Sequence, residues 1–132
     1  CSLDSLPECD TAVDLGTLSG DTAGTLISES GAGNRWFRIE ITEDEEGLSG
    51  VNLSARIALT PPAGVDYDLR VYRGDCSSDG QHSELSGDVS ENVVVSWEDE
   101  FGSDASYLYV FVEHYEGESC APYTLTLEGN VQ

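Results

Sequence analysis

The sequence predicts an all-β protein, an antiparallel sandwich or barrel of about eight short strands. Apolar and polar side chains alternate with period two over most of the chain, as in strands with one buried face. Turn-forming stretches rich in Gly, Ser, Asp and Pro separate these segments. No convincing helix appears, because the acidic stretch 41–48 lies between predicted strands and contains a glycine. We therefore expect one domain over residues 1–132.

Six segments carry the alternation most clearly. In residues 35–42, Phe37, Ile39 and Ile41 share one face. Residues 107–115 are apolar on both faces, which is typical of a central strand. The predicted strands are 35–42, 51–59, 66–73, 92–97, 107–115 and 123–128, with weaker candidates at 12–18 and 24–28.

Charge is the strongest bulk property of the chain. It has 26 acidic residues and 5 basic ones, all arginine, for a net charge of −21. A polyanion needs a basic footprint, so we expect neither nucleic acid nor an anionic membrane surface as a partner. Two interpretations of the acidity stay open. One is a hydrated surface suited to salty water, and the other is binding of divalent cations.

The four cysteines indicate an oxidising compartment. Cys1, Cys9, Cys76 and Cys120 are even in number and contain no CxxC spacing, so disulfides fit better than a zinc ribbon or a redox motif. An alternative is a lipidated Cys1, as in bacterial lipoproteins, which would leave three cysteines. No apolar run approaches the ~20 residues that cross a bilayer.

Several motifs in the second half resemble a known family. "VDYDLRVYRGDC", "VVVSWED" and "YLYVFVEHYEGESCAPYTLTLEG" are similar to the bacterial pre-peptidase C-terminal domain, with its Asp-x-Asp-Leu strand and closing Tyr-Thr-Leu-Thr strand. The first half matches more loosely, through "DLGTLSGDTAGTL" and "NRWFRIEIT". The resemblance covers most of residues 12–129 and leaves 1–11 as an N-terminal segment. It implies a jelly-roll sandwich without catalytic activity, appended to exported bacterial proteins.

The resemblance also implies a calcium site. In calcium-binding relatives, the collagen-binding domains of clostridial collagenases, ligands come from an N-terminal acidic segment and from the Asp-x-Asp-Leu strand. The matching residues are Glu8, Asp10, Asp66 and Asp68. Carboxylate oxygens are the ligands that calcium prefers. Cys9 departs from the family pattern, and a disulfide there is an alternative staple. Solvated carboxylates are the other interpretation.

Tyrosines on 107–115 suggest a binding face. Tyr109 and Tyr115 correspond in position to tyrosines that collagen-binding relatives use. If the face opposite Leu108 is open, these rings would bind an extracellular protein or polysaccharide, because tyrosines give large contact area with few rotatable bonds. The alternative is a strand buried on both sides, which we favour for Phe111.

Other motifs give weaker evidence of function. Arg73-Gly74-Asp75 is an adhesion tripeptide in form, but we expect the turn that ends a strand, with glycine supplying a positive φ. Asp75 and Asp79 lack the spacing of an EF-hand loop. His82 and His114 are the only histidines, and no Gly-x-Ser-x-Gly elbow exists to anchor a hydrolase triad.

Sequence leaves three disulfide connectivities open. Placing the turns after 66–73 and before 123–128 at one end of the sandwich predicts Cys76–Cys120, and then Cys1–Cys9. The function we expect is that of a secreted or cell-surface accessory or binding module, monomeric and not an enzyme. A calcium-stabilised adhesion domain and a secreted hydrolase are the alternatives.

Overall fold

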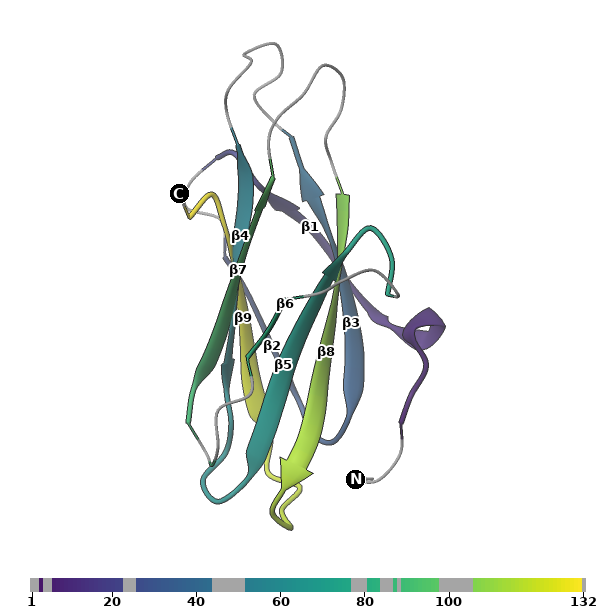
Figure 1. Cartoon of the computed structure of the whole chain (residues 1–132), viewed down its shortest axis with the longest axis vertical. Coiled ribbons are helices and arrows are strands. Elements are labelled where there is room, and N and C mark those ends of the chain that lie inside the picture. Colours follow the sequence, from purple (N-terminus) through teal and green to yellow (C-terminus); the bar gives the residue numbers. More distant parts are fainter. Residues whose placement is uncertain are drawn as a thin grey trace.

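Two β-sheets stack face to face in the computed structural model (Figure 1). The structure describes residues 3, 6–22, 26–43, 52–76, 81–83, 87, 89–97 and 106–131, with only the backbone at 81–83. The five-stranded sheet has the order β1 (Val13–Ser19), β3 (Arg35–Thr42), β8 (Ser106–Glu116), β5 (Asp66–Arg73) and β6 (Gln81–Ser83). The four-stranded sheet has the order β2 (Leu26–Gly31), β9 (Tyr123–Gly129), β4 (Leu53–Thr60) and β7 (Glu91–Trp97). The predicted all-β sandwich is confirmed.

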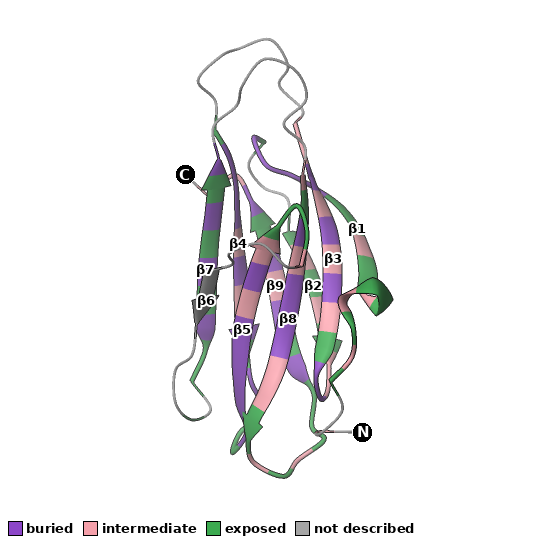
Figure 2. Cartoon of the chain, turned by 45° about the vertical axis from the view of Figure 1, so that its right-hand side comes forward, coloured by how far each residue is buried: buried purple, intermediate pink, exposed green. Residues whose placement is uncertain are grey.

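The alternation of the sequence becomes the core. In β3 and β8, Phe37 lies opposite Val110 and Ile39 opposite Leu108, and all four point inward. In β4 and β9, Ile57 faces Leu127. Figure 2 shows buried and exposed positions alternating along β7. The largest fully buried side chains are Tyr67, Tyr123, Phe37, Ile39, Ile41, Leu53, Ile57, Leu59, Leu69, Leu108, Leu125 and Leu127.

The connectivity is that of a jelly-roll-type sandwich, because most successive strands lie in different sheets. The chain crosses from β3 to β4, back to β5, and again from β6 to β7 and from β7 to β8. Both weak strand candidates exist, as β1 and β2. The short β6 and the 3-10 turn η1 (Cys9–Thr11) were not predicted.

One pairing departs from the expected antiparallel arrangement. β1 runs parallel to β3, and its register shifts between Asp14 and Thr17. The Asp14 carboxylate accepts a hydrogen bond from the Gly16 backbone N–H at 2.8 Å, and Gly16 has φ +92°. That local turn supplies the irregularity, because glycine adopts a positive φ at little cost.

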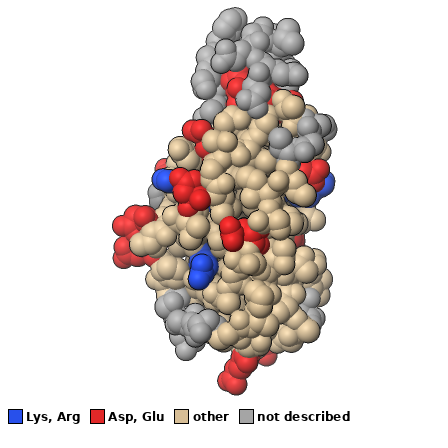
Figure 3. Space-filling model, turned by 180° about the vertical axis from the view of Figure 1, so that it is seen from behind, with Lys and Arg blue, Asp and Glu red and all other residues tan. Residues whose placement is uncertain are grey.

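Charge is spread over the surface. Seen from behind, acidic side chains lie at the margins and near the middle of the face, with few Lys or Arg atoms and uncharged areas between them (Figure 3). On the four-stranded sheet, Arg56 and Glu128 face each other across β4 and β9, with 3.8 Å between guanidinium and carboxylate. The described residues contain no helix that is long and apolar enough to cross a membrane.

Candidate metal centre and the face around Tyr109

Three buried carboxylates converge where the two sheets meet at one edge. Asp66 and Asp68 belong to β5, and Glu91 begins β7 of the other sheet. One oxygen from each side chain lies within 4.8 Å of the others. Their exposed fractions are 5%, 6% and 1%, so water reaches the group poorly. Burial of three acids at such distances is costly unless a cation or protons compensate the charge.

Local strand pairing explains why this edge can hold the group. The short β6 pairs with Leu69–Val71 of β5, so in the described residues it does not run beside Asp66 or Asp68. The first residue of β7 lies close to that margin instead. Glu91 lies on the same buried face of β7 as Val93, Val95 and Trp97. Its carboxylate therefore points toward the interior rather than into solvent.

The turn that leads into β5 is fixed by close packing. Val65 donates a backbone hydrogen bond to Pro62 O at 3.3 Å, and Gly64 has φ +79°. Gly117, after β8, packs directly on this turn: a Cβ there would lie 2.5 Å from Gly64 O. A side chain at position 117 would therefore push the turn away and displace Asp66.

One oxygen of Asp66 indicates that the three carboxylates need a compensating positive charge. The Asp66 Oδ1 is buried and accepts no hydrogen bond from the residues that the structure describes. A buried carboxylate oxygen without a donor is rare in folded proteins, because its desolvation is not offset. A cation among the three side chains would satisfy this oxygen. The donors are all carboxylate oxygens, the ligands of a hard divalent ion.

The structure brings together only part of the predicted calcium ligand set. Asp66 and Asp68 are in the cluster, as predicted, whereas Glu8 and Asp10 belong to the distant N-terminal segment. The Glu8 carbonyl accepts the Thr11 N–H at 3.0 Å, and Asp10 lies in η1. Glu91 was missed. The sequence did contain a signal for Glu91, because this acid occupies a position where the alternation of the strand predicts a buried, apolar side chain.

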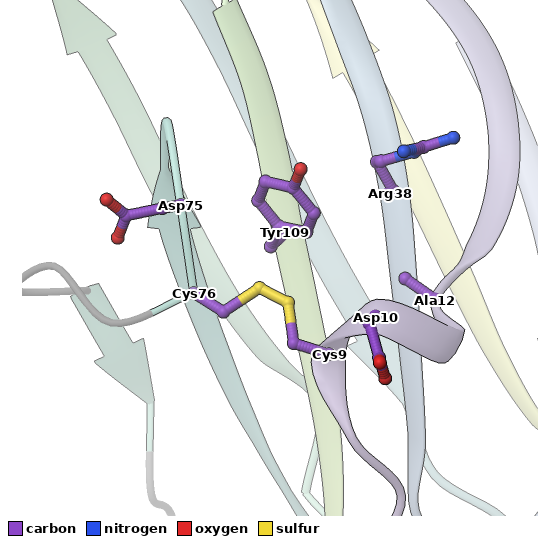
Figure 4. Close-up of a pocket in the computed structure, with 7 residues that line it drawn as sticks. All are labelled: Cys9, Asp10, Ala12, Arg38, Asp75, Cys76 and Tyr109. Carbon is purple, nitrogen blue, oxygen red and sulfur yellow. A yellow bond between two sulfur atoms is a disulfide. The ribbon is translucent and has the colours of Figure 1, made fainter.

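The N-terminal segment crosses the outer face of the five-stranded sheet, and a small cavity of about 280 Å³ lies beside it (Figure 4). Tyr109 projects between the disulfide and Arg38. Asp10 and Asp75 flank the cavity from two different segments, and their carboxylates point away from each other. Its lining residues are Cys9, Asp10, Ala12, Arg38, Asp75, Cys76 and Tyr109.

Arg38 beside this cavity is held by Asp14. Their guanidinium and carboxylate are 2.7 Å apart, and the guanidinium also lies 5.1 Å from the ring centre of Tyr107. The Gly16 backbone N–H, and next the Arg38 hydrogen bond, lower the pKa of Asp14 below its ordinary value. The Asp14 hydrogen bond in turn raises the pKa of Arg38. The Asp14 carboxylate therefore compensates the positive charge of Arg38 on one side of the guanidinium.

The outer aromatic row is not one open face. Tyr109 and Tyr115 are six residues apart on β8, roughly 20 Å at the strand rise, so they cannot belong to one small site. Tyr115 is 69% exposed, whereas Tyr109 is partly buried beside the disulfide. Phe111 is buried, as favoured from the sequence, with Trp36 stacked on it at 4.7 Å between ring centres.

The predicted disulfide pairing is wrong. Cys9 is bonded to Cys76, with their Cα atoms 6.3 Å apart. Cys120 is also disulfide-bonded, but Cys76 is not its partner, and Cys1 lies outside the described residues. The prediction failed because it placed the turn after β5 and the turn after β8 at one end of the sandwich. The two strands are antiparallel, so Arg73 pairs with Leu108 at one end and Asp66 with Glu116 at the other, and Cys76 and Cys120 follow opposite ends. The N-terminal segment instead runs over the outer sheet face and reaches the end of β5.

The Arg-Gly-Asp tripeptide is a strand-ending turn, as expected. Gly74 has φ +89°, and its N–H donates to Tyr107 O at 2.9 Å. The Arg73 guanidinium lies 4.9 Å from the ring centre of Trp97, toward the other sheet, while Asp75 lines the cavity. The two charged side chains are thus committed to different surroundings.

His114 has structural contacts. Its backbone N–H donates to Asn34 Oδ1, and its ring hydrogen-bonds Gly117 O, both at 2.6 Å. The ring also meets Tyr67 edge-on, at 5.6 Å between centres. These contacts agree with the interpretation of His114 as a sheet-end residue.

The comparisons with family models and with curated proteins found no relative. Function must therefore be argued from the site itself.

Proposed function

We propose that this chain is a non-catalytic extracellular module whose sandwich is stabilised by a bound divalent cation, calcium in particular. The observation that carries the proposal is Asp66 Oδ1, buried without a hydrogen bond among three converging carboxylates. A cation there would join β5 to β7 and so join one sheet to the other. Its role would be structural, because the carboxylates are enclosed rather than presented to a substrate.

The chemistry of the donors selects the ion. Cysteine and histidine are absent from the group, which disfavours zinc, whose structural sites use sulfur and nitrogen. Magnesium needs near-ideal octahedral geometry and usually keeps several waters, which a buried site admits poorly. Calcium accepts irregular oxygen sites, and three carboxylates offer three to six of its ligands. Extracellular modules typically bind calcium at about 10⁻⁴–10⁻³ M.

The assignment to an exported binding module draws on three features. The resemblance to the pre-peptidase C-terminal domain, the disulfide between Cys9 and Cys76, and the net charge of −21 all fit an extracellular setting. The partner class we propose is an extracellular protein or polysaccharide. The full reading frame, and binding of the purified chain to insoluble polysaccharide and collagen, would test this part separately.

The calcium site is tested by calorimetric titration of the metal-free chain, with the melting temperature measured alongside. We expect one site per chain, an affinity above that for magnesium, and a melting temperature that rises with calcium beyond a matched ionic-strength control. Asp66→Asn should abolish the heat of binding. Glu128→Gln, which removes the same charge from an exposed position on β9, should retain it. Equal responses of wild type and Asp66→Asn would exclude this site.

A further inference from the structure

Each neighbour of Asp66 in the chain has its own anchor. Val65, before it, is fully buried and donates its backbone N–H to Pro62 O at 3.3 Å. Tyr67, after it, is also fully buried, and its hydroxyl accepts the Gly33 N–H at 2.9 Å. The position of the Asp66 carboxylate therefore depends on how firmly these two neighbours are held.

His114 on β8 reaches both neighbours of Asp66. Its ring meets the Tyr67 ring edge-on, at 5.6 Å between centres. Its Nε2 donates a hydrogen bond to Gly117 O at 2.6 Å, since a carbonyl oxygen can only accept. Gly117 in turn packs on the turn before Asp66, where a Cβ at position 117 would lie 3.0 Å from Val65 Cα. One side chain thus contacts Tyr67 directly and Val65 through Gly117.

His114 is itself fixed by the turn between β2 and β3. Its backbone N–H donates to Asn34 Oδ1 at 2.6 Å, and Asn34 is buried. The preceding residue, Gly33, is the one that holds the Tyr67 hydroxyl. A single turn therefore anchors both the histidine and the tyrosine. We call Asn34, Tyr67, His114 and Gly117 the His114 network.

The placement of the carboxylates matters because calcium and magnesium differ in size. Two oxygens that share one ion lie at most twice the bond length apart, about 4.6–5.2 Å for calcium and about 4.0–4.2 Å for magnesium. The oxygens of Asp66, Asp68 and Glu91 lie within 4.8 Å of one another. This limit falls inside the calcium range. Magnesium sets the tighter requirement, so its binding depends more on carboxylates that can move inward.

We propose that His114 is a positioning residue that sets the selectivity of this site for calcium over magnesium. The inference rests on the proposed cation site and names the residue that governs its choice of ion. By holding both neighbours of Asp66, the His114 network keeps that carboxylate from closing on the smaller ion. Residues that orient ligands without touching the metal typically change metal affinity by about 10–100-fold when they are replaced.

The test measures the calcium and magnesium affinities of the full chain by calorimetry, starting from the metal-free protein. His114→Ala removes both contacts of the ring. We expect its calcium affinity to fall about tenfold or more, and the ratio of calcium to magnesium affinity to fall about fivefold or more. His114→Gln places an amide N–H donor at about the reach of Nε2, so it should recover part of the ratio.

Ile41→Val is the matched control for a change in packing. Ile41 is buried opposite Ser106 at one end of β8, whereas Asp66 lies opposite Glu116 at the other end. This variant trims a core side chain without touching the His114 network. It should leave the ratio of the two affinities unchanged.

Amide hydrogen exchange in EDTA tests the positioning without any metal. The Val65 and Gly33 N–H groups report on the two anchors. Both should exchange faster in His114→Ala than in wild type and at the wild-type rate in Ile41→Val. His114→Phe keeps the ring against Tyr67 and removes only the bond to Gly117 O. It should speed exchange at Val65 but not at Gly33 and lower the ratio less, which keeps the test decisive if His114→Ala does not fold.

The outcomes separate this inference from the proposed function. A wild-type chain that binds neither ion shows that the cation site itself is wrong, and the selectivity role falls with it. If wild type prefers calcium and the folded His114 variants keep its ratio, the site stands and His114 does not set its selectivity. A fall of both affinities by one common factor also overturns the proposal, because it shows a structural role alone. A lower ratio together with faster exchange at Val65 supports it.

Discussion

Asp66 and Glu91 belong to different sheets, yet their carboxylate oxygens lie within 4.8 Å of each other. Neither acid can move away without disturbing a strand, because Asp66 opens β5 and Glu91 opens β7. Charge in this position therefore acts on the contact between the sheets. Without a cation, repulsion between the two carboxylates would push the edge apart, and a bound cation would draw it together.

Neutralising one acid should have opposite effects with and without metal. In chelator, Glu91→Gln should raise the free energy of unfolding by about 1–3 kcal/mol, because it removes repulsion at short range. In calcium, the same variant should show no calcium-dependent rise in melting temperature. Chemical denaturation in EDTA and in calcium measures both. A variant less stable than wild type in EDTA and still calcium-responsive would contradict a cation site here.

The bond between Cys9 and Cys76 should contribute strongly to stability. It closes a sequence separation of 67 residues, which the chain-entropy treatment values at about 4 kcal/mol. Cys9→Ser with Cys76→Ser should lower the free energy of unfolding by an amount of that order. Peptide mapping without reduction should first return a Cys9–Cys76 peptide. A Cys76–Cys120 or Cys1–Cys9 peptide would show the bonding to be otherwise.

The buried hydroxyl of Tyr123 should lower the stability of the fold, and removing that hydroxyl alone should recover the loss. Its hydroxyl is buried and has no hydrogen-bond partner among the described residues, so Tyr123→Phe should leave stability unchanged or raise it by up to about 1–2 kcal/mol. Gly31→Ala should destabilise the chain, because the new Cβ would lie 2.8 Å from the Tyr123 hydroxyl. The double variant should recover part of that loss. Strict additivity of the two changes in denaturation experiments would argue against this contact.

The same tyrosine predicts alkaline behaviour. Burial raises the pKa of the Tyr123 phenol far above its usual range. Because the folded-state pKa exceeds the unfolded one of about 10, ionisation does not affect the free energy of unfolding below about pH 10. Above about pH 10 that free energy falls as the pH rises, because the unfolded chain ionises this phenol first. Absorbance at alkaline pH should show a tyrosine component that ionises only as the chain unfolds. Tyr123→Phe should reduce that late component by one phenol.

Asp14 should titrate abnormally on the acid side. Its folded pKa lies below the ordinary value, so its contribution to stability is present above about pH 4 and is lost as the pH falls through the lower folded pKa. Carboxyl chemical shifts in NMR measure this directly. Arg38→Gln should raise the pKa of Asp14 only partly, because the Gly16 N–H, the larger cause, remains. A full return to the ordinary value would show that Arg38 dominates.

Salt should stabilise the chain even without divalent ions. With 26 acids and 5 arginines, self-repulsion opposes compaction at low ionic strength. The melting temperature should rise between low and high NaCl, and KCl at equal ionic strength should give the same rise. A melting temperature independent of salt would show that repulsion between the acidic side chains does not destabilise the fold.

Period-two alternation identified the strands well, because each strand buries one face whatever its neighbours are. It predicted 35–42 and 66–73 with the bounds that β3 and β5 have. It could not show that β1 pairs in parallel with β3, since a strand at a sheet edge has the same pattern in either direction.

The site was only half predictable for a similar reason. Asp66 and Asp68 were expected as ligands from the family resemblance, and they lie together because they are two residues apart on one strand. Glu91 joins them through the packing of one sheet on the other, a contact between residues that are distant in the sequence. Cys9 likewise finds Cys76 because the N-terminal segment lies over an outer sheet face, and no local pattern encodes that path.

The bond between Cys9 and Cys76 also decides how mechanical tension passes through the molecule. A pulling force that arrives at Cys9 is transmitted through the sulfurs to Cys76. The loop between these two cysteines, which contains β1 to β5, therefore carries no load. About 230 Å of contour length therefore stays hidden while the bond is closed. Reduction would let this length unravel under load, so a tethered module would change from a short, stiff link into a long, extensible one.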